Sequence, residues 1–222
     1  MKYKFLLNSN YCFSKLVTTF LLIMYNFLSA QSVVTNIVRN GNGNIVGIEY
    51  YNKVSKNLEL LKLETFHPNG HVARLELFSS GVKNGVHKEF FNNGNIKIDG
   101  QYSDGYKSGL WTEYFRGGGT MRRFYSNENG KNGRFHEWYK NGGKKIRGEY
   151  SQGQKNGLWT AWHLNGVKES VVTFNQGEQE GVFSYFYDNG NKKSEGIVSY
   201  KGQKEQRCWD IYGNTQNCIK GD

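Results

Sequence analysis

The chain has 222 residues, a formal net charge of +10, 28 glycines, a single proline and 15% aromatic residues. So many aromatics exclude an intrinsically disordered chain, and the basic balance favours acidic partners without specifying a fold. Frequent glycines beside many aromatics predict β-strands joined by tight turns.

Residues 1–30 have the pattern of a secretory signal peptide. Three lysines and no acidic residue occur before residue 31, and an apolar run at residues 16–30 ends in Ser29 and Ala30. Basic, apolar and small residues in that order are typical of an export signal. A membrane anchor is the alternative, but the run is shorter than the roughly 20 residues that span a bilayer. We therefore expect cleavage near Ala30, no integral membrane segment afterwards, and a periplasmic, cell-surface or secreted protein.

Two interleaved series of glycines recur every 24 residues, which indicates a repeat protein. The first series is Gly85, Gly109, Gly133, Gly157 and Gly181. The second series, usually preceded by asparagine, is Gly70, Gly94, Gly118, Gly142, Gly166 and Gly190. Aromatic residues recur at fixed places between the glycines. The pattern predicts a repeat array at residues 63–214, preceded by a cap or divergent repeat at 31–62 and followed by a tail at 215–222.

Each repeat is predicted to form one β-hairpin. In the copy that starts at Gly157, we expect strands at residues 158–163 and 168–174 and turns at 164–166 and 175–180, because asparagine and glycine suit tight turns. The predicted fold is all-β: an elongated, single-layer antiparallel meander of about 12–14 strands. The period of two in a strand places Trp159 on one face and Leu158 on the other.

The recurring pattern resembles the MORN-variant repeat, the second form of the membrane occupation and recognition nexus repeat of bacterial proteins. The segments that carry the resemblance read KSGLWTEYFRGGG at residues 107–119 and KNGLWTAWHLNGVKES at residues 155–170. The resemblance implies an elongated β-meander used for binding or scaffolding. Members of the family are often labelled antitoxin-like, an intracellular role that does not fit an export signal.

A column of lysines at the repeat period is the first candidate binding surface. Lys83, Lys107, Lys131 and Lys155 stand two residues before the first glycine of each repeat, in the predicted turns. A ladder of lysines suits a polyanion or an anionic lipid surface; the alternative is solvated turn lysines that prevent aggregation. Trp111 and Trp159, if exposed between the lysines, would stack on sugar rings.

The sequence offers little support for catalysis. All five histidines occupy repeat positions, where substitution for an aromatic side chain favours a structural role. A recurring glutamate column includes Glu89, Glu113 and Glu137. Paired carboxylates hydrolyse glycosides, but a column repeated in successive hairpins favours a polar row beside cross-strand lysines. We expect no catalytic residue, no metal ion and no cofactor.

Once the first thirty residues are removed, Cys208 and Cys218 are the two cysteines that remain. Their presence in an exported protein predicts a disulfide, and two free thiols are the alternative. Overall we predict a non-enzymatic exported scaffold or binding module. A protein is the expected partner, an anionic lipid or glycan is the alternative, and nucleic acid is not expected. An antitoxin or immunity protein that binds a toxin, and an envelope polymer hydrolase that uses Glu113 and Glu137, remain alternatives.

Overall fold

The computed structural model describes residues 32–54 and 56–218, and the predicted signal peptide lies outside them. These residues form sixteen strands and no helix. The strands are β1 Val33–Arg39, β2 Ile45–Val54, β3 Asn57–Phe66, β4 Val72–Ser79, β5 Val82–Phe90, β6 Ile96–Ser103, β7 Tyr106–Tyr114, β8 Thr120–Asn127, β9 Gly130–Trp138, β10 Lys144–Ser151, β11 Gln154–Trp162, β12 Lys168–Asn175, β13 Glu178–Phe186, β14 Lys192–Val198, β15 Lys204–Trp209 and β16 Thr215–Gln216. Within this part of the chain, no helix long and apolar enough to cross a membrane is found.

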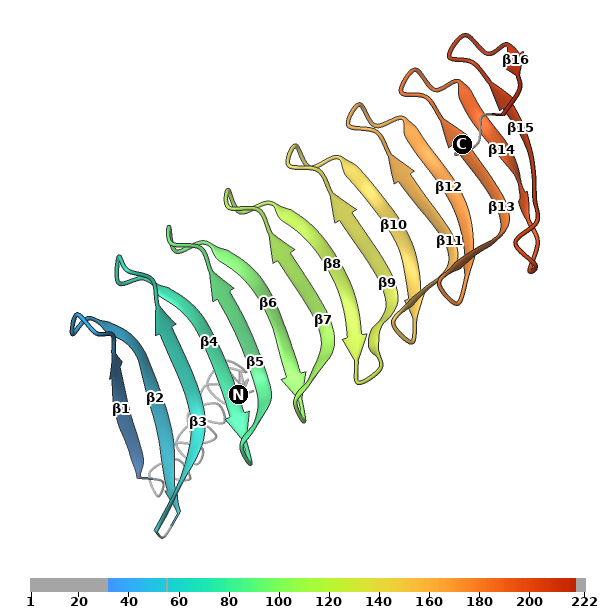
Figure 1. Cartoon of the computed structure of the whole chain (residues 1–222). Helices are drawn as coiled ribbons and strands as arrows, with labels where there is room; N and C mark the ends of the chain where they lie inside the picture. Colours follow the sequence, from blue (N-terminus) through green and yellow to red (C-terminus); the bar gives the residue numbers. More distant parts are fainter. Residues whose placement is uncertain (1–31, 55, 219–222) are drawn as a thin grey trace, which may run out of the picture.

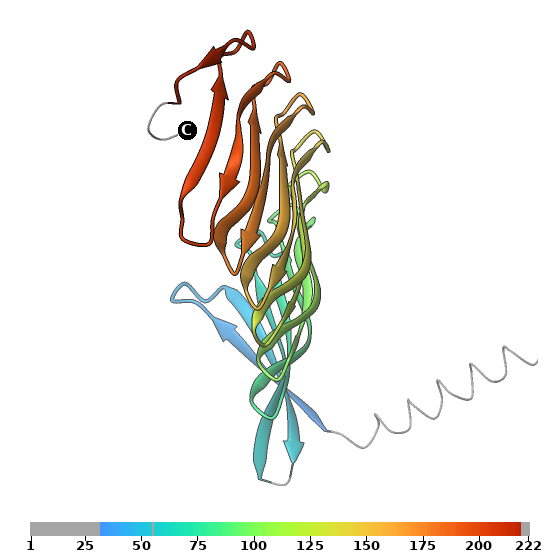
Figure 2. The same cartoon turned by 90° about the vertical axis from the view of Figure 1, so that its right-hand side faces the viewer.

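All sixteen strands belong to one open sheet in which each strand pairs antiparallel with the strand that precedes it in the sequence. Figure 1 shows the hairpins side by side in the order of the sequence, and Figure 2 shows that the sheet twists along its length. The predicted all-β, single-layer meander is confirmed. The sheet has more strands than the 12–14 expected, because the segment before the array also forms strands of the same sheet.

As far as β14, two kinds of turn alternate along the chain and lie at opposite ends of the strands (Figure 1). In the long turns the chain closes a five-residue loop: the amide of His163 donates to the carbonyl of Val167 over 2.8 Å, and Gly166 donates to His163 over 2.9 Å. The turn from β14 to β15 closes by the same hydrogen bonds as the long turns, with the amide of Ser199 donating to the carbonyl of Gln203 over 2.9 Å. In four of the short turns, those that join β4 to β5, β6 to β7, β10 to β11 and β12 to β13, two residues with positive φ follow each other, as in Gln176 (46°) and Gly177 (90°). Two left-handed residues define the type I′ turn, whose twist matches that of the flanking strands.

The first glycine series does not form turns, so the predicted turn at residues 175–180 and the predicted strand start at residue 158 are wrong in their bounds. Gly157 lies inside β11 with a φ of 71°, and the register between β10 and β11 shifts beside it. It therefore sits in a β-bulge, where one strand carries extra residues opposite its partner. Glycine supplies a positive φ in a bulge as readily as in a turn, and the sequence signal is the same.

The two faces of the sheet differ in burial. We call the packed face the one that carries the buried row Trp111, Phe124, Phe135, Trp159, Val172 and Phe183. The opposite face, which carries Leu110, Tyr125, Leu158 and Val182, is called the open face. Trp159 is 5% exposed and its neighbour Leu158 is 56% exposed, which confirms that they lie on opposite faces.

Rings of successive hairpins contact one another on the packed face, which compensates for the absence of a second layer. The ring centroids of Tyr150 and Trp159 lie 4.9 Å apart with the planes nearly perpendicular, and those of Tyr102 and Trp111 lie 5.2 Å apart. Such edge-to-face pairs contribute about 0.5–1.5 kcal/mol each beyond the area they bury. The stability of each hairpin therefore depends on its neighbours.

A disulfide closes the last hairpin of the sheet. Cys208 in β15 and Cys218, which follows β16, are bonded, with their Cα atoms 5.2 Å apart. Cys208 is 3% exposed and pairs with Ser194 of β14. The bridge holds the short strand β16 at the edge of the sheet.

Candidate functional site

The lysine column lies within strands and over aromatic rings. Lys83, Lys107, Lys131 and Lys155 are the second residues of β5, β7, β9 and β11. The Nζ atom of Lys107 stands 4.2 Å from the ring centroid of Trp111, and that of Lys155 stands 4.8 Å from the rings of Trp159 and Phe174. The ammonium groups therefore make cation–π contacts on the packed face.

This placement corrects two expectations from the sequence. The lysines are not turn residues, because each first glycine forms a bulge inside the strand. The turn therefore lies before the lysine in the sequence, and the lysine side chain lies over the packed face. The tryptophans are not exposed between them, since Trp111 is 1% and Trp159 5% exposed. Lys131 lies near three rings, and its burial lowers the pKa of its ammonium group. The column contributes to packing as well as to charge.

Each glutamate of the predicted row has its own cationic partner. The carboxylates of Glu89 and Glu137 lie 3.0 Å and 2.8 Å from the ammonium groups of Lys97 and Lys145. Glu113 lies 3.5 Å from Arg122, whose register position is directly between Glu113 on β7 and Glu137 on β9. The two glutamates that a hydrolase would require are thus separated by an arginine and held in ion pairs.

Two histidines link neighbouring hairpins at the end of the strands where the long turns lie. The Nε2 atoms of His67 and His163 donate to the carbonyl oxygens of Phe90 and Phe186, over 2.8 Å and 3.0 Å. The hydroxyl of Tyr139, at the equivalent repeat position, donates to the carbonyl of Trp162 over 2.7 Å. A polar ring at this position therefore joins one repeat to the next.

The other three histidines are also held by neighbours. The Nδ1 atom of His71 lies 2.8 Å from the carbonyl of Asn92. His87 is 5% exposed, and burial lowers its pKa, although Glu76 and Glu89 stand beside it. His136, on the open face, lies with its ring 5.6 Å from that of Trp138. Among the described residues no group of histidine, cysteine, aspartate and glutamate is arranged to hold a metal ion.

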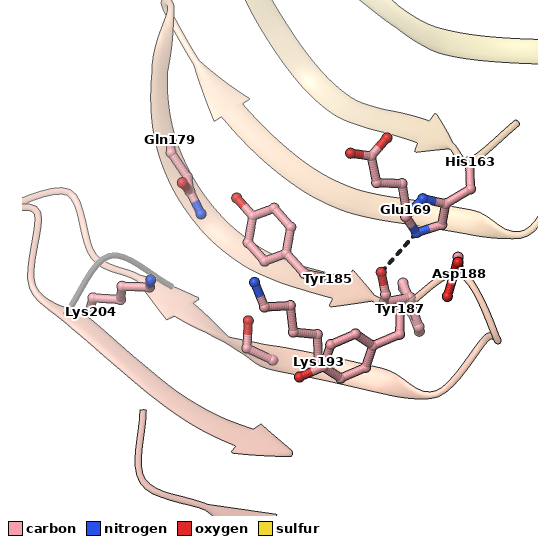
Figure 3. Close-up of a pocket in the computed structure, with 10 residues that line it drawn as sticks. His163, Glu169, Gln179, Tyr185, Tyr187, Asp188, Lys193 and Lys204 are labelled. Atoms are coloured by element: carbon pink, nitrogen blue, oxygen red, sulfur yellow. Dashed lines mark hydrogen bonds between the residues drawn. The ribbon is translucent and has the colours of Figure 1, made fainter. Parts of the chain in front are cut away.

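A hollow of about 710 Å³ lies on the packed face between β11 and β15. Figure 3 shows Glu169, His163 and Asp188 at one end and Gln179 and Lys204 at the other. Its floor includes Ser194, which is 1% exposed and whose hydroxyl oxygen has no hydrogen-bond partner in the described part of the chain. The lining carries carboxylates and ammonium groups together, so it does not select a charge.

The open face carries a row of exposed apolar side chains across many hairpins. Leu110 of β7 pairs directly with Tyr125 of β8, and Val182 of β13 pairs directly with Ile197 of β14. Their exposed fractions range from 40% for Leu110 to 59% for Val182. Leu158 lies between these pairs. Arg134 and Glu149, on β9 and β10, separate the first pair from Leu158. Several exposed apolar side chains on one face of a sheet are characteristic of an interaction site.

Three arginines lie on the same open face, and the sequence analysis did not single them out. Arg123 of β8 and Arg147 of β10 both pair in register with His136 of β9, and Arg134 lies two residues before this histidine. The signal was present in the sequence, because Arg123 and Arg147 are 24 residues apart. It was weak because the arginine occurs in only two consecutive repeats.

A family model matches two of the hairpins. Residues 83–104 and 179–200 match the family model described as the MORN repeat variant, and these segments cover the hairpins β5–β6 and β13–β14. No curated protein matches the chain. A crystal structure of a protein with unknown function from Bacteroides fragilis NCTC 9343 matches 85% of this chain and 99% of its own at 9% identity, with a TM-score of 0.16. The chain therefore contains MORN-variant repeats in two of its hairpins.

Proposed function

We propose that the protein is an exported, non-enzymatic repeat module that binds a protein partner through its open face. The exposed apolar row of Leu110, Tyr125, Leu158, Val182 and Ile197 supports this proposal most directly. Apolar and aromatic side chains that a monomer leaves exposed form the centre of protein interfaces. The packed face contributes less, because its rings are buried and its lysines and glutamates are engaged.

The placement of the histidines and glutamates supports a role other than catalysis. His67, His71 and His163 lie within hydrogen-bond distance of carbonyl groups of the neighbouring hairpin, and His87 is buried. A general base requires a side chain within reach of a substrate proton. Since the glutamates are held in ion pairs, we place neither set in a reaction. Binding of a toxin by an immunity protein is a special case of the same activity.

Capture with matched leucine variants tests the proposal. The purified protein, its Leu158→Asp variant and its Leu164→Asp variant are immobilised and exposed to envelope extracts. Leu158 and Leu164 are both exposed leucines, at 56% and 63%, but Leu164 lies in a long turn. We expect a protein retained by the wild type and by Leu164→Asp and lost with Leu158→Asp. Equal retention by all three would refute the assignment of the open face.

Fractionation of cells that express the full chain tests the proposed export. The protein should appear outside the cytoplasm in a form shortened near Ala30, as read by mass spectrometry of its N-terminus. A full-length protein in the cytoplasmic fraction would contradict this part of the proposal.

A further inference from the structure

One row of directly paired residues crosses the open face from β5 to β15. Its two ends carry ion pairs, whereas its middle carries cations alone. The row starts with Lys88 and Asp99, whose charged atoms lie 3.5 Å apart. It ends with Glu195 and Arg207, 3.1 Å apart. Both ends are therefore neutralised by ion pairs. Between these ends the ionisable side chains of the row are Arg123, His136 and Arg147, all potential cations.

The central arginines have no anionic partner. Within the described residues, neither a hydrogen bond nor an ion pair engages Arg123 or Arg147, and both are exposed. The nearest pair on this face joins Arg134 to Glu149 at 4.0 Å, with the two side chains 73% and 65% exposed. An exposed pair at that distance contributes little. The patch made of Arg123, Arg134, His136 and Arg147 is therefore an unbalanced positive charge.

The spacing of the patch is fixed by the sheet. Neighbouring strands lie about 4.8 Å apart, so Arg123 and Arg147 stand roughly 10 Å apart with His136 midway. Like charges at this spacing repel one another, and an anion placed between them removes the repulsion. The planar guanidinium group matches a carboxylate, because it donates two parallel hydrogen bonds.

The surroundings of the patch favour a protein as the source of the anion. The ring of Trp138 lies beside His136, and the exposed side chains of Leu110, Tyr125 and Leu158 lie on the same face. Arginine, tryptophan and tyrosine beside apolar side chains are the composition of the energetic centre of protein interfaces. A polysaccharide or a phosphate backbone has no aliphatic side chains to cover two exposed leucines.

We propose that the patch of Arg123, Arg134, His136 and Arg147 binds an acidic segment of a protein partner, whose carboxylates pair with Arg123 and Arg147. Apolar side chains of the same segment cover Leu110 and Leu158. This inference rests on the proposed function and adds to it the chemistry of the partner. The lysine column of the packed face takes no part in it.

A synthetic probe tests the proposal without knowledge of the natural partner. A fluorescein-labelled peptide of alternating glutamate and leucine residues is titrated with the full chain, and its anisotropy is followed. The test variant is Arg123→Gln/Arg147→Gln. The control variant, Lys88→Gln/Arg207→Gln, removes the same net charge from the same row, but at positions that are already ion-paired.

We expect binding of the peptide, weakened about tenfold or more in the test variant and about twofold or less in the control, since lost charge-assisted bonds outweigh a general change in net charge. A peptide of alternating glutamine and leucine should bind at least about tenfold more weakly. Equal urea midpoints of the three proteins exclude unfolding as the cause.

Other results overturn the inference in distinguishable ways. Equal binding by the test variant, or no binding of the acidic peptide, removes the acidic partner. Arginine-dependent binding of heparin, or of vesicles of phosphatidylglycerol and phosphatidylcholine, in place of the peptide would assign the patch to a glycan or a lipid surface. If the arginine variant still captures the partner that Leu158→Asp loses, the inference fails and the proposed function stands.

Discussion

The indole ring of Trp159 lies so close to the backbone of Gly148 that a Cβ atom on Gly148 would stand 2.2 Å from the ring. Trp111 and Gly100 have the same relationship, at 2.4 Å. In the intervening repeat the position of the glycine is taken by Phe124, which faces Phe135 across the strands. In these three consecutive repeats a large ring over a bare backbone therefore alternates with two rings side by side, and in the next repeat Val172 faces Phe183.

This contact predicts that Gly148→Ala destabilises the sheet. The added methyl group has no space, and forcing it into a packed core costs about 1–3 kcal/mol. The matched control is Gly117→Ala, where a Cβ would meet nothing within 4 Å. Urea unfolding should show a lower midpoint for Gly148→Ala and a change below about 0.5 kcal/mol for the control. Equal midpoints would show that the ring moves aside without cost.

The hydroxyl of Tyr139 predicts a measurable link between two repeats. Tyr139→Phe keeps the ring but removes the 2.7 Å hydrogen bond to the carbonyl of Trp162, at a cost of about 0.5–1.5 kcal/mol. Phe91 and Phe115 occupy the same repeat position, so the ring alone is tolerated there. Tyr114→Phe, whose hydroxyl bonds to none of the described residues, should leave the free energy of unfolding unchanged. A similar loss in both variants would argue against the link.

Buried His87 predicts a contribution to stability that disappears in acid. Burial lowers the pKa of its imidazole below the ordinary value of 6.5, so between the lowered pKa and 6.5 the unfolded chain binds more protons than the folded one. Stability therefore falls as the pH drops through this window. His87→Phe, which introduces the type of side chain found in other repeats, should lose less stability between pH 7 and pH 5. Parallel pH profiles of urea midpoints would refute this.

His136 predicts that acid strengthens the binding of the acidic peptide. Burial lowers the pKa of His136, and Arg147, Arg134, Arg123 and Lys144 lower it further. A bound carboxylate raises that pKa again, so the complex takes up a proton and its affinity rises as the pH falls from 8 towards 6. With His136→Asn the affinity should be flat over the same range. Affinity that declines in the wild type would contradict the proposed position of the carboxylate.

The disulfide predicts a local rather than a global effect of reduction. A closed loop of this size contributes about 3 kcal/mol in the chain-entropy account, and it acts on β15 and β16 at the edge of the sheet. Hydrogen exchange with dithiothreitol present should lose protection in β15 and leave β9 unchanged. Cooperative loss of protection in both strands would show that the bridge supports the whole array.

The period, the hairpins and the two faces could be predicted from the sequence because identical spacing recurs in every repeat. The position of the short turns could not be, since Gly157 in a bulge and Gly177 in a turn both have positive φ and the sequence marks both with the same residue. Because Gly157 forms a bulge and not a turn, Lys155 lies in a strand with its ammonium group over the ring of Trp159 and not in a solvated turn. For this local reason the expected turn position of the lysines and the expected exposure of Trp111 and Trp159 were wrong, while binding by the lysine column stays a prediction.

The open-face site was harder to predict because no motif marks it. It depends on the lack of an acidic partner for two arginines in the described part of the chain. Arg123 and Arg147 lie in a column whose other members are Leu75, Asp99, Val171 and Glu195. Only the register of the strands shows that Asp99 and Glu195 are each paired with a cation of the same row. The sequence supplies the arginines, and the pairing pattern leaves them without a partner.

Each strand packs chiefly against its two neighbours in the sheet, so the length of the molecule is set by the number of its hairpins. Gain or loss of one 24-residue unit would change the length of the sheet by one hairpin and leave the contacts on either side intact. A unit inserted between β10 and β11 would move the C-terminal hollow away from the arginine patch without separating the residues of either. Distance between docking points is thus a trait that such a chain can change in single steps, separately from what each point recognises.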